Sequence, residues 1–314
     1  MDKNTEYEEI KSKNPNLIHI SFSELTQFRG CGHKHLLEKY LKLAVSPTSI
    51  HLIFGSAIHS ALEIGVRDKI NLEGRIAHFK EYFTKEMMDK MMNTKDYENV
   101  ESFTEQGEHI LRLLSTEKIL EKYDLIGVEM LLYENLFNNF HFKGFIDLIL
   151  KDKKTGRILI IDWKSSSEQW DVQKKKKDKI FVAQMRLYKY FYSRKFNVPM
   201  DEIDCKYIVL NRLKSKKCPE LGFGAIQPVE IFSTNDDINE AVTLVANTLR
   251  DIHINKDFQK AKCVDRKKDC FFCQYKSNPT LCNNNENQYK YMLDEHRERR
   301  ISIEKGEDVK VLYN

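Results

Sequence analysis

Long apolar runs are missing from this chain of 314 residues, and its first residues lack an apolar segment. No run of about 18 or more apolar residues occurs, so we expect no transmembrane helix and no membrane partner. Residues 1–16 are charged and do not resemble a secretory signal peptide, so we expect a flexible leader there. A cytoplasmic protein is the resulting expectation.

The chain also has little net charge, because 51 lysines and arginines face 47 aspartates and glutamates. The resulting charge of +4 predicts no nucleic-acid partner by itself, so local clusters such as lysines 174–177 matter more. Apolar residues make up 41% of the chain, which is enough for a sizeable core and excludes global disorder.

The spacing of apolar residues changes from a helical period to a strand period near residue 123. We expect a helical region at 17–122, an α/β core at 123–255, and a cysteine-bearing segment with a charged tail at 256–314. A helix between the strands predicted at 157–164 and 203–211 permits parallel pairing, so the sheet should be mixed. Further strands are predicted at 123–136, 140–151 and 223–232, and helices at 33–43, 75–92, 102–122, 180–196 and 236–253.

One predicted strand ends in charged side chains after four large apolar residues at 158–161. Asp162 and Lys164 lie two residues apart, so they point to the same face of an extended chain. Asp147 stands in the apolar run of the preceding strand, where a buried carboxylate is costly unless it pairs or binds a cation. In a hairpin the two carboxylates can converge and hold Mg²⁺ or Mn²⁺. Lys164 would then orient an attacking water and balance negative charge.

His59 lies on a predicted helix whose small residues at 55–57 permit close packing. As a ligand, its imidazole nitrogen would favour Mn²⁺. Simpler interpretations exist, because Asp162 and Lys164 can form a plain salt bridge and a single histidine is more often packed or solvated than bound to metal. The ordered set of residues, each in a suitable element, favours the metal site.

Three short motifs follow one another in an order typical of one superfamily. They are Gly144-x-x-Asp147, Asp162-Trp163-Lys164 and Gln184-x-x-x-Tyr188, with the helix around His59 upstream. They resemble the PD-(D/E)XK nucleases, and more narrowly their RecB-type branch. The resemblance implies a restriction-endonuclease-like α/β core, with a central mixed sheet flanked by helices, between a helical N-terminal region and a C-terminal cysteine segment.

The resemblance also implies roles for single residues. Asp147, Asp162 and His59 would be metal ligands, and Lys164 would be the catalytic lysine. Ser165 stands where the family often has threonine, which keeps a hydroxyl group at that position.

Other residues are candidates for support of the site or for DNA contacts. Gln184 and Tyr188 share a helix face and would lie near the active site or the DNA. Glu129 is either a supporting carboxylate or a solvent-facing charge. A phosphate-binding loop or a solvated charge run is expected at Lys174, Lys175, Lys176 and Lys177. Trp170 either stacks on a base or covers the core. Contacts to the DNA backbone imply little sequence specificity.

Four of the seven cysteines suggest a cofactor. Four thiolates can hold a [4Fe–4S] cluster or a Zn²⁺ ion. Cys31 precedes the core and Cys270, Cys273 and Cys282 follow it, which resembles RecB-type nucleases with an iron–sulfur staple, such as AddB-like and exonuclease V-like nucleases and the CRISPR-associated spacer-acquisition nuclease. The resemblance favours the iron–sulfur cluster over zinc.

The cysteine spacing leaves alternatives open. The interval from Cys273 to Cys282 is longer than is usual in the family, so Cys263 is a substitute ligand. A local zinc knuckle could use Cys263, Cys270, Cys273 and Cys282. Cys205 lies in a predicted strand, where we expect a buried apolar residue, and Cys218 lies in a predicted loop as an unligated thiol.

Together with the predicted metal site, this resemblance implies a Mg²⁺- or Mn²⁺-dependent DNA nuclease of a bacterium or phage. An exonuclease acting on single strands or duplex ends, in DNA recombination, repair or processing and with a helicase or recombination protein as partner, is the first hypothesis. The second is a catalytically silent DNA-binding or scaffold subunit with a nuclease fold. The third is a zinc-stapled interaction module.

Overall fold

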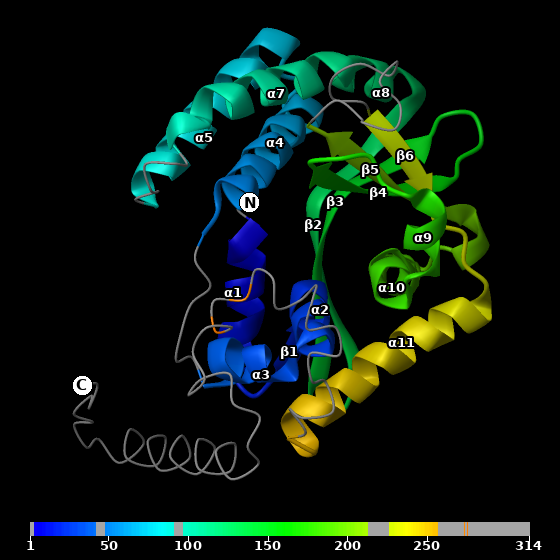
Figure 1. Cartoon of the computed structure of the whole chain (residues 1–314). Helices are drawn as coiled ribbons and strands as arrows, with labels where there is room; N and C mark the ends of the chain where they lie inside the picture. Colours follow the sequence, from blue (N-terminus) through cyan, green and yellow to red (C-terminus); the bar gives the residue numbers. More distant parts are fainter. Residues whose placement is uncertain are drawn as a thin grey trace, which may run out of the picture. The chain divides into compact units, whose positions relative to one another are not determined.

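The computed structural model describes residues 3–41, 48–90, 97–212 and 226–256, together with Cys273 and Tyr275 (Figure 1). The chain divides into two compact units. The first comprises Met1–Phe22 and Thr48–Ala246, and the second comprises Ser23–Pro47 and Asn247–Asn314. Among the described helices, none has the length and apolar character needed to cross a membrane.

Six strands of the described residues form a mixed sheet at the centre of the first unit. Strands β2 (Tyr123–Phe137) and β3 (Phe140–Asp152) form a long antiparallel hairpin. Strand β4 (Ile158–Ser166) runs antiparallel to β3 and parallel to β5 (Ile203–Asn211). Strand β6 (Ile226–Glu230) runs antiparallel to β5, and β1 (Ile18–Ser21) runs parallel to β3.

Strand β3 is paired by β2 along one edge and by two different strands along the other. On that second edge, β1 pairs with residues 140–143 and β4 pairs with residues 148–151. Residues 144–147 lie between these two ladders, and no described strand pairs with them on this edge. Asp147 is at the end of this gap, where β3 diverges from β4.

Helix α10 (Lys179–Phe196) covers one face of the sheet (Figure 1). It begins at Asp178, whose side chain accepts hydrogen bonds from two backbone N–H groups of the first turn, and ends at Asn197, whose φ of 54° cannot continue a helix. Phe191 of α10 stacks on Phe142 of β3 with ring centroids 5.0 Å apart. This contact fixes which face of β3 is turned toward α10.

Helices α4 (Ile50–Arg67), α5 (Leu72–Asp89) and α7 (Val100–Leu113) form the main apolar core of this unit with β3, β4 and β5. Ser49 and Asn71 cap α4 and α5. The phenyl rings of Phe54, Phe79 and Phe83 pack edge to face or stacked at the centre of this core. Burial of each such ring contributes about 1.5–3 kcal/mol, so α4 is held firmly against the sheet.

The second unit contains most of α2 (Phe22–Gly30), the short helix α3 (Gly32–His35), and π-helical turns at Leu36–Tyr40 and Arg250–Ile254. Cys31 caps α3, because its Sγ accepts a hydrogen bond from Lys34 N at 3.4 Å. Arg29 donates to Thr248 Oγ1 at 2.8 Å and lies 3.4 Å from Asp251. Helix α11 (Asn235–Leu249) begins in the first unit and ends in the second.

The predicted strands at 123–136, 140–151, 157–164 and 203–211 are confirmed as β2 to β5, and β6 lies within the strand predicted at 223–232. Three local predictions are wrong. Residues 3–13 form α1 (Lys3–Lys13) rather than a flexible leader, and Tyr7 on this helix is buried. The helix predicted at 102–122 is broken, because Ser115 caps a separate helix α8 (Thr116–Lys122). The lysines at 174–177 belong to the short helix α9 (Val172–Lys177) rather than to a loop.

Candidate active site

The side chain of Asp147 joins β3 to β4 at the gap where the two strands diverge. The backbone N–H of Trp163 donates to Asp147 Oδ2 at 2.7 Å. Burial raises the pKa of Asp147 well above its usual value, and the carboxylates of Asp162 and Glu129 raise it further, while Lys164 acts in the opposite direction. A carboxyl group in these surroundings is stable as an anion only with a compensating cation.

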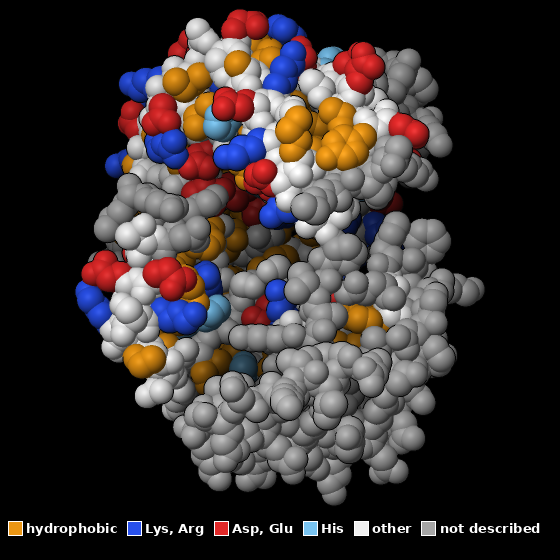
Figure 2. All heavy atoms as spheres, turned by 90° about the vertical axis from the view of Figure 1, so that its left-hand side faces the viewer, with side chains coloured by type: hydrophobic (Ala, Val, Ile, Leu, Met, Phe, Trp, Pro, Cys, Tyr) orange, Lys and Arg blue, Asp and Glu red, His pale blue; other side chains and the backbone are white. Residues whose placement is uncertain are grey.

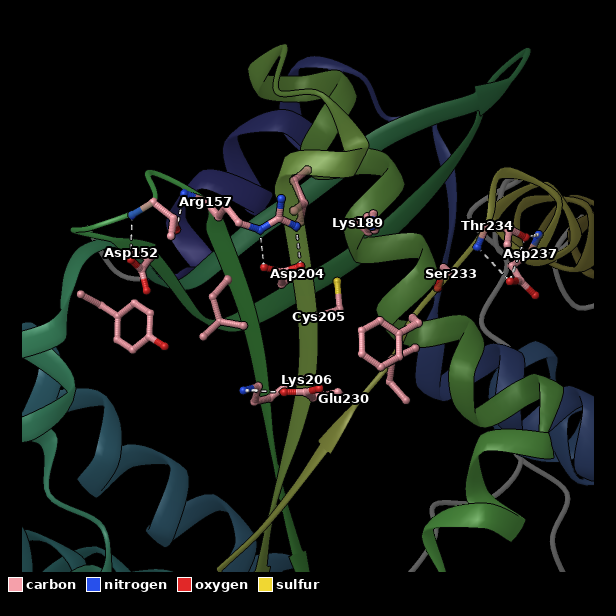
Figure 3. A pocket seen from close by; sticks show the side chains of 16 residues that line it. Asp152, Arg157, Lys189, Asp204, Cys205, Lys206, Glu230, Ser233, Thr234 and Asp237 are labelled. Atoms are coloured by element: carbon pink, nitrogen blue, oxygen red, sulfur yellow. Dashed lines mark hydrogen bonds and ion pairs between the residues drawn. The ribbon is translucent and has the colours of Figure 1, made fainter.

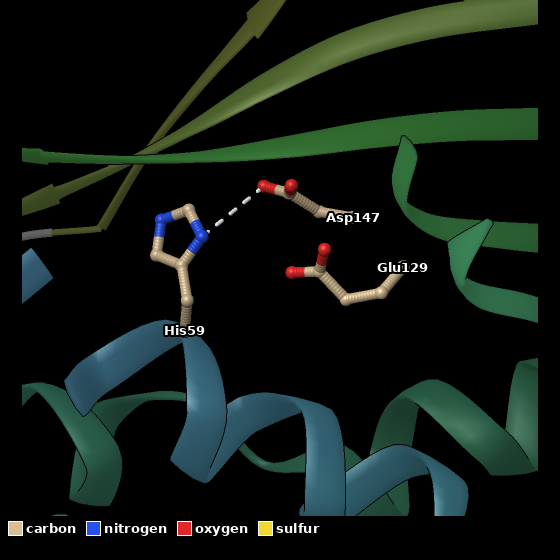
Figure 4. A group of neighbouring side chains, drawn as sticks. All are labelled: His59, Glu129 and Asp147. Carbon is tan, nitrogen blue, oxygen red and sulfur yellow. Dashed lines mark ion pairs between the residues drawn. The ribbon is translucent and has the colours of Figure 1, made fainter. Parts of the chain in front are cut away.

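His59 and Glu129 point toward Asp147 from two other elements (Figure 4). His59 extends from α4, and its Nδ1 lies 3.4 Å from Asp147 Oδ2. Each of the three side chains offers one ligand atom, and these atoms lie within 4.8 Å of one another. One nitrogen and two carboxylate oxygens at this spacing fit a divalent cation such as Mn²⁺ or Mg²⁺.

Glu129 reaches this group through an irregularity of strand β2. It stands opposite Asp147, between the cross-strand pairs Val128–Leu148 and Met130–Ile146. Its φ of 48° lies in the left-handed region, which is uncommon for a residue other than glycine. Such irregularities in strands re-aim side chains and cluster near functional sites. The structure therefore favours the interpretation of Glu129 as a member of the site.

Asp162 is 1% exposed and is held by two neighbours. Lys164 Nζ forms an ion pair with its Oδ1, and Gln184 Nε2 donates to its Oδ2 at 2.8 Å. The same amide donates to Tyr188 Oη at 3.0 Å, and that hydroxyl donates to the carbonyl oxygen of Phe145 at 2.8 Å. Burial raises the pKa of Asp162, and the adjacent Lys164 lowers it. The network therefore fixes the carboxylate of Asp162 in one orientation.

The structure groups the predicted ligands differently from the sequence. The sequence predicts His59, Asp147 and Asp162 as one metal-binding set, whereas the described residues bring Glu129 together with His59 and Asp147. Asp162 is engaged by Lys164 and Gln184, yet it is close enough to raise the pKa of Asp147. The Lys164 side chain is 31% exposed, so its ammonium links a buried carboxylate to solvent.

Tyr207 of β5 belongs to this network and was missed by the sequence analysis. It is the register partner of Asp162 on the neighbouring parallel strand, and its ring centroid lies 5.6 Å from Lys164 Nζ. Its buried hydroxyl donates to the carbonyl oxygen of Phe181 at 2.8 Å. The strand sequence alone does not distinguish Tyr207 from a core residue, but the β4–β5 register identifies it.

A steric constraint explains why glycine occupies position 144 in the motif Gly144-x-x-Asp147. A Cβ atom at this position would lie 2.7 Å from Cε1 of Tyr188, which is closer than side chains tolerate. Glycine therefore lets the Tyr188 ring approach the backbone of β3 and place its hydroxyl at the carbonyl of Phe145.

Residues 19–278 match the family model of the PD-(D/E)XK nuclease superfamily. The chain belongs to this superfamily. Membership confirms the predicted restriction-endonuclease-like fold, in which a central mixed sheet is flanked by helices. No curated protein gave a significant match to the chain.

Trp170 and Lys175, two of the predicted DNA contacts, pack against neighbouring side chains in the structure. Trp170 packs edge to face against Phe181 and Tyr207, with centroid distances of 5.1 Å and 6.1 Å. Its indole N–H donates to Ser166 Oγ at 3.1 Å, so Trp170 covers the core beside β4. Lys175 Nζ lies 4.9 Å from the Trp170 ring, which places helix α9 next to it.

The structure describes three of the cysteines. Cys31 and Cys273 are half-buried thiols of the second unit. Cys205 is buried in β5, as predicted, and burial raises its pKa to about 12. The predictions for Cys218, Cys263, Cys270 and Cys282 lie outside the described residues.

A cavity of about 720 Å³ lies at the other end of β4 and β5, lined among others by Arg157, Asp204, Cys205 and Lys206 (Figure 3). Its charged groups largely satisfy one another, since Arg157 pairs with Asp204 and Lys206 pairs with Glu230. This cavity lacks His59, Glu129 and Asp147, so it is not the candidate active site.

On the face seen in Figure 2, basic and acidic side chains are interspersed over the described surface rather than segregated.

Proposed function

We propose that this protein is a Mg²⁺- or Mn²⁺-dependent deoxyribonuclease that hydrolyses phosphodiester bonds. The observation that carries the proposal is the convergence of His59, Glu129 and Asp147 beside the ion pair of Lys164 with the buried Asp162. A DNA exonuclease of the RecB-type branch, acting on single strands or duplex ends in recombination, repair or processing, is the specific form we infer.

Each side chain has a defined task in this proposal. His59, Glu129 and Asp147 would hold the divalent cation, which would supply Lewis-acid chemistry to the phosphodiester. Lys164 Nζ, half-exposed beside Asp162, donates hydrogen bonds to the attacking water or to the phosphate oxygens. Gln184 keeps the Asp162 carboxylate turned toward Lys164, which limits the motion of the ammonium.

Cleavage by a Lys164→Met variant tests the proposal. We expect at least a 100-fold loss of Mn²⁺-dependent cleavage of end-labelled DNA, because one electrostatic donor contributes about 10²–10³-fold to such reactions. Lys206→Met is a matched control, since Lys206 is also a half-buried lysine paired with a carboxylate, at 3.4 Å from Glu230. Full activity of folded Lys164→Met, or an equal loss in Lys206→Met, contradicts the assignment.

The wild-type protein distinguishes the nuclease from a silent DNA-binding subunit. Titration with Mg²⁺ and Mn²⁺ should produce cleavage of labelled DNA that EDTA abolishes. DNA binding without cleavage at any metal concentration would support the silent subunit instead. Substrates with blocked and free ends then separate exonuclease from endonuclease activity.

We also propose a [4Fe–4S] cluster with Cys31, Cys270, Cys273 and Cys282 as ligands. Cys31 and Cys273 are half-buried thiols of the same compact unit, which supports a shared site. Anaerobically purified protein should absorb near ~400 nm and contain iron, as thiolate clusters do. Stoichiometric zinc without this absorption contradicts the cluster and supports the zinc alternative.

Lysines 174–177 on helix α9 are proposed as a phosphate-binding surface. Replacing all four with glutamine should weaken binding equally for different DNA sequences and reduce its salt dependence. An unchanged salt dependence would assign these lysines to a solvated surface.

A further inference from the structure

The face of β3 that carries Asp147 extends away from the site as a row of half-buried side chains. From residue 140 to 147 burial alternates strictly, with 140, 142, 144 and 146 buried and 141, 143, 145 and 147 half-buried. The buried set faces α10, as the stacking of Phe142 on Phe191 shows. The half-buried set therefore lies on the other face, which His59 approaches from α4.

Phe145 and Lys143 are the neighbours of Asp147 in this row. At about 3.4 Å per residue, they lie about 7 Å and 14 Å from Asp147 along the strand. Lys143 Nζ is 5.7 Å from the centroid of the Phe145 ring. From Asp147 toward the start of β3, one surface thus carries first an apolar ring and then an ammonium group.

Helix α1 ends this row beyond Lys143. Tyr7 of α1 packs against Tyr133, the cross-strand partner of Lys143, with ring centroids 5.7 Å apart. Lys143 Nζ also lies 3.3 Å from the centroid of the Tyr7 ring. The accessible part of the row is therefore short and begins at the candidate active site.

We propose that Phe145 and Lys143 form a binding track for one single strand of DNA that enters the Asp147 site. The proposal rests on the proposed nuclease function and adds the residues that select a single strand. An aromatic ring can stack under an unpaired base, and the ammonium can contact the neighbouring phosphate. Bases in a duplex are already stacked on one another, so the ring selects single strands.

A core role for Phe145 is the alternative that the geometry disfavours. Phe142, three residues earlier, is fully buried and stacked on Phe191. Phe145 remains half-buried on the opposite face, although full burial of a phenyl ring is the more stable arrangement. The half-buried ring therefore stands beside the polar site, where a base can stack on it.

Binding of fluorescein-labelled oligonucleotides in EDTA, followed by anisotropy, tests the track. Phe145→Ala should weaken binding of a single strand by about 5- to 150-fold, the equivalent of one stacked base. Phe145→Trp should retain tight binding, which shows that the aromatic face rather than a fold defect is responsible. Phe196→Ala is the matched control, since Lys195 Nζ lies 5.8 Å from the Phe196 ring on α10.

A second variant tests the ammonium. Lys143→Gln should reduce the slope of log K against log salt concentration by about 0.7 for a single strand, as expected for one lost phosphate contact. Binding of the matching duplex should change by less than about 2-fold in both variants. Unchanged single-strand affinity in Phe145→Ala, or an equal loss for duplex, overturns the track.

Hydrolysis of bis(4-nitrophenyl) phosphate with Mn²⁺ separates this inference from the proposed function, because that small diester has no neighbouring nucleotides. If the wild type hydrolyses neither the diester nor DNA while Phe145→Ala still loses single-strand affinity, the nuclease function fails and the track stands. If the wild type cleaves both and Phe145→Ala binds single strands normally, the track fails and the function stands.

Discussion

Asp147→Asn should make the metal-free protein more stable while it abolishes cleavage. Asparagine keeps an oxygen that can accept the hydrogen bond from Trp163 N, which is 2.7 Å long in the wild type. It removes a negative charge whose ligand atom lies within 4.8 Å of that of Glu129. At this distance two carboxylates repel by about 1 kcal/mol in water and about 3.5 kcal/mol at an effective dielectric constant of about 20.

Part of this gain is lost with the attraction between Asp147 and Lys164. We therefore expect a net stabilisation of about 1–2 kcal/mol in EDTA, which raises Tm by roughly 1.5–3 °C for a protein of this size. Such a gain is typical of functional residues that are held in unfavourable surroundings. Added Mn²⁺ should reverse the order, because a cation that binds only the folded wild type stabilises it selectively.

The gain should also depend on pH. Aspartate in the unfolded chain titrates near ~3.9, whereas the pKa of Asp147 in the folded protein is raised. Between the two pKa values the folded wild type holds a proton that the unfolded chain has released, so its stability falls as pH rises. The asparagine variant lacks this loss, and its advantage should be small near about pH 4 and larger near about pH 8. Thermal melts in EDTA at both pH values measure the difference, and an advantage that is absent or does not shrink toward acid would refute the reasoning.

Three further predictions follow from contacts around the site. Gly144→Ala should cost about 1–3 kcal/mol in urea unfolding, because its Cβ would lie 2.7 Å from Tyr188. Gly30→Ala should not destabilise the protein, because no atom of the described residues lies within 4 Å of its Cβ, and equal effects of the two variants would contradict this steric explanation. Gln184→Leu should cost about 1–3 kcal/mol, because it removes the donor to buried Asp162, and a stability equal to wild type by urea unfolding would show that this hydrogen bond contributes nothing. The Cys205 thiol, with a pKa raised by burial to about 12, should resist iodoacetamide in the native state, and rapid labelling of its peptide in mass spectrometry would disprove its burial.

Much of the fold can be predicted from local patterns. The apolar runs of β3 and β4, the change of period near residue 123 and the helix between β4 and β5 are properties of neighbouring residues, so they specify strands, a hairpin and one parallel pair. The segment 3–13 is different, because its own sequence is too polar to form an isolated amphipathic helix. Tyr7 packs against Tyr133 in the structure, and that contact is invisible in the sequence of the leader.

For the site, the sequence determined which residue types are present and their order. Strand periodicity places Asp162 and Lys164 on one face and Asp147 in an apolar run, whereas Gln184 and Tyr188 could be named only from their resemblance to a superfamily motif. The tertiary structure alone decided how they are grouped. Glu129 joins His59 and Asp147 through a left-handed residue in β2, Asp162 turns to Lys164 and Gln184, and Tyr207 enters through the β4–β5 register. These contacts depend on register, on strand irregularities and on the divergence of β3 from β4, which join residues far apart in the chain and leave no local pattern.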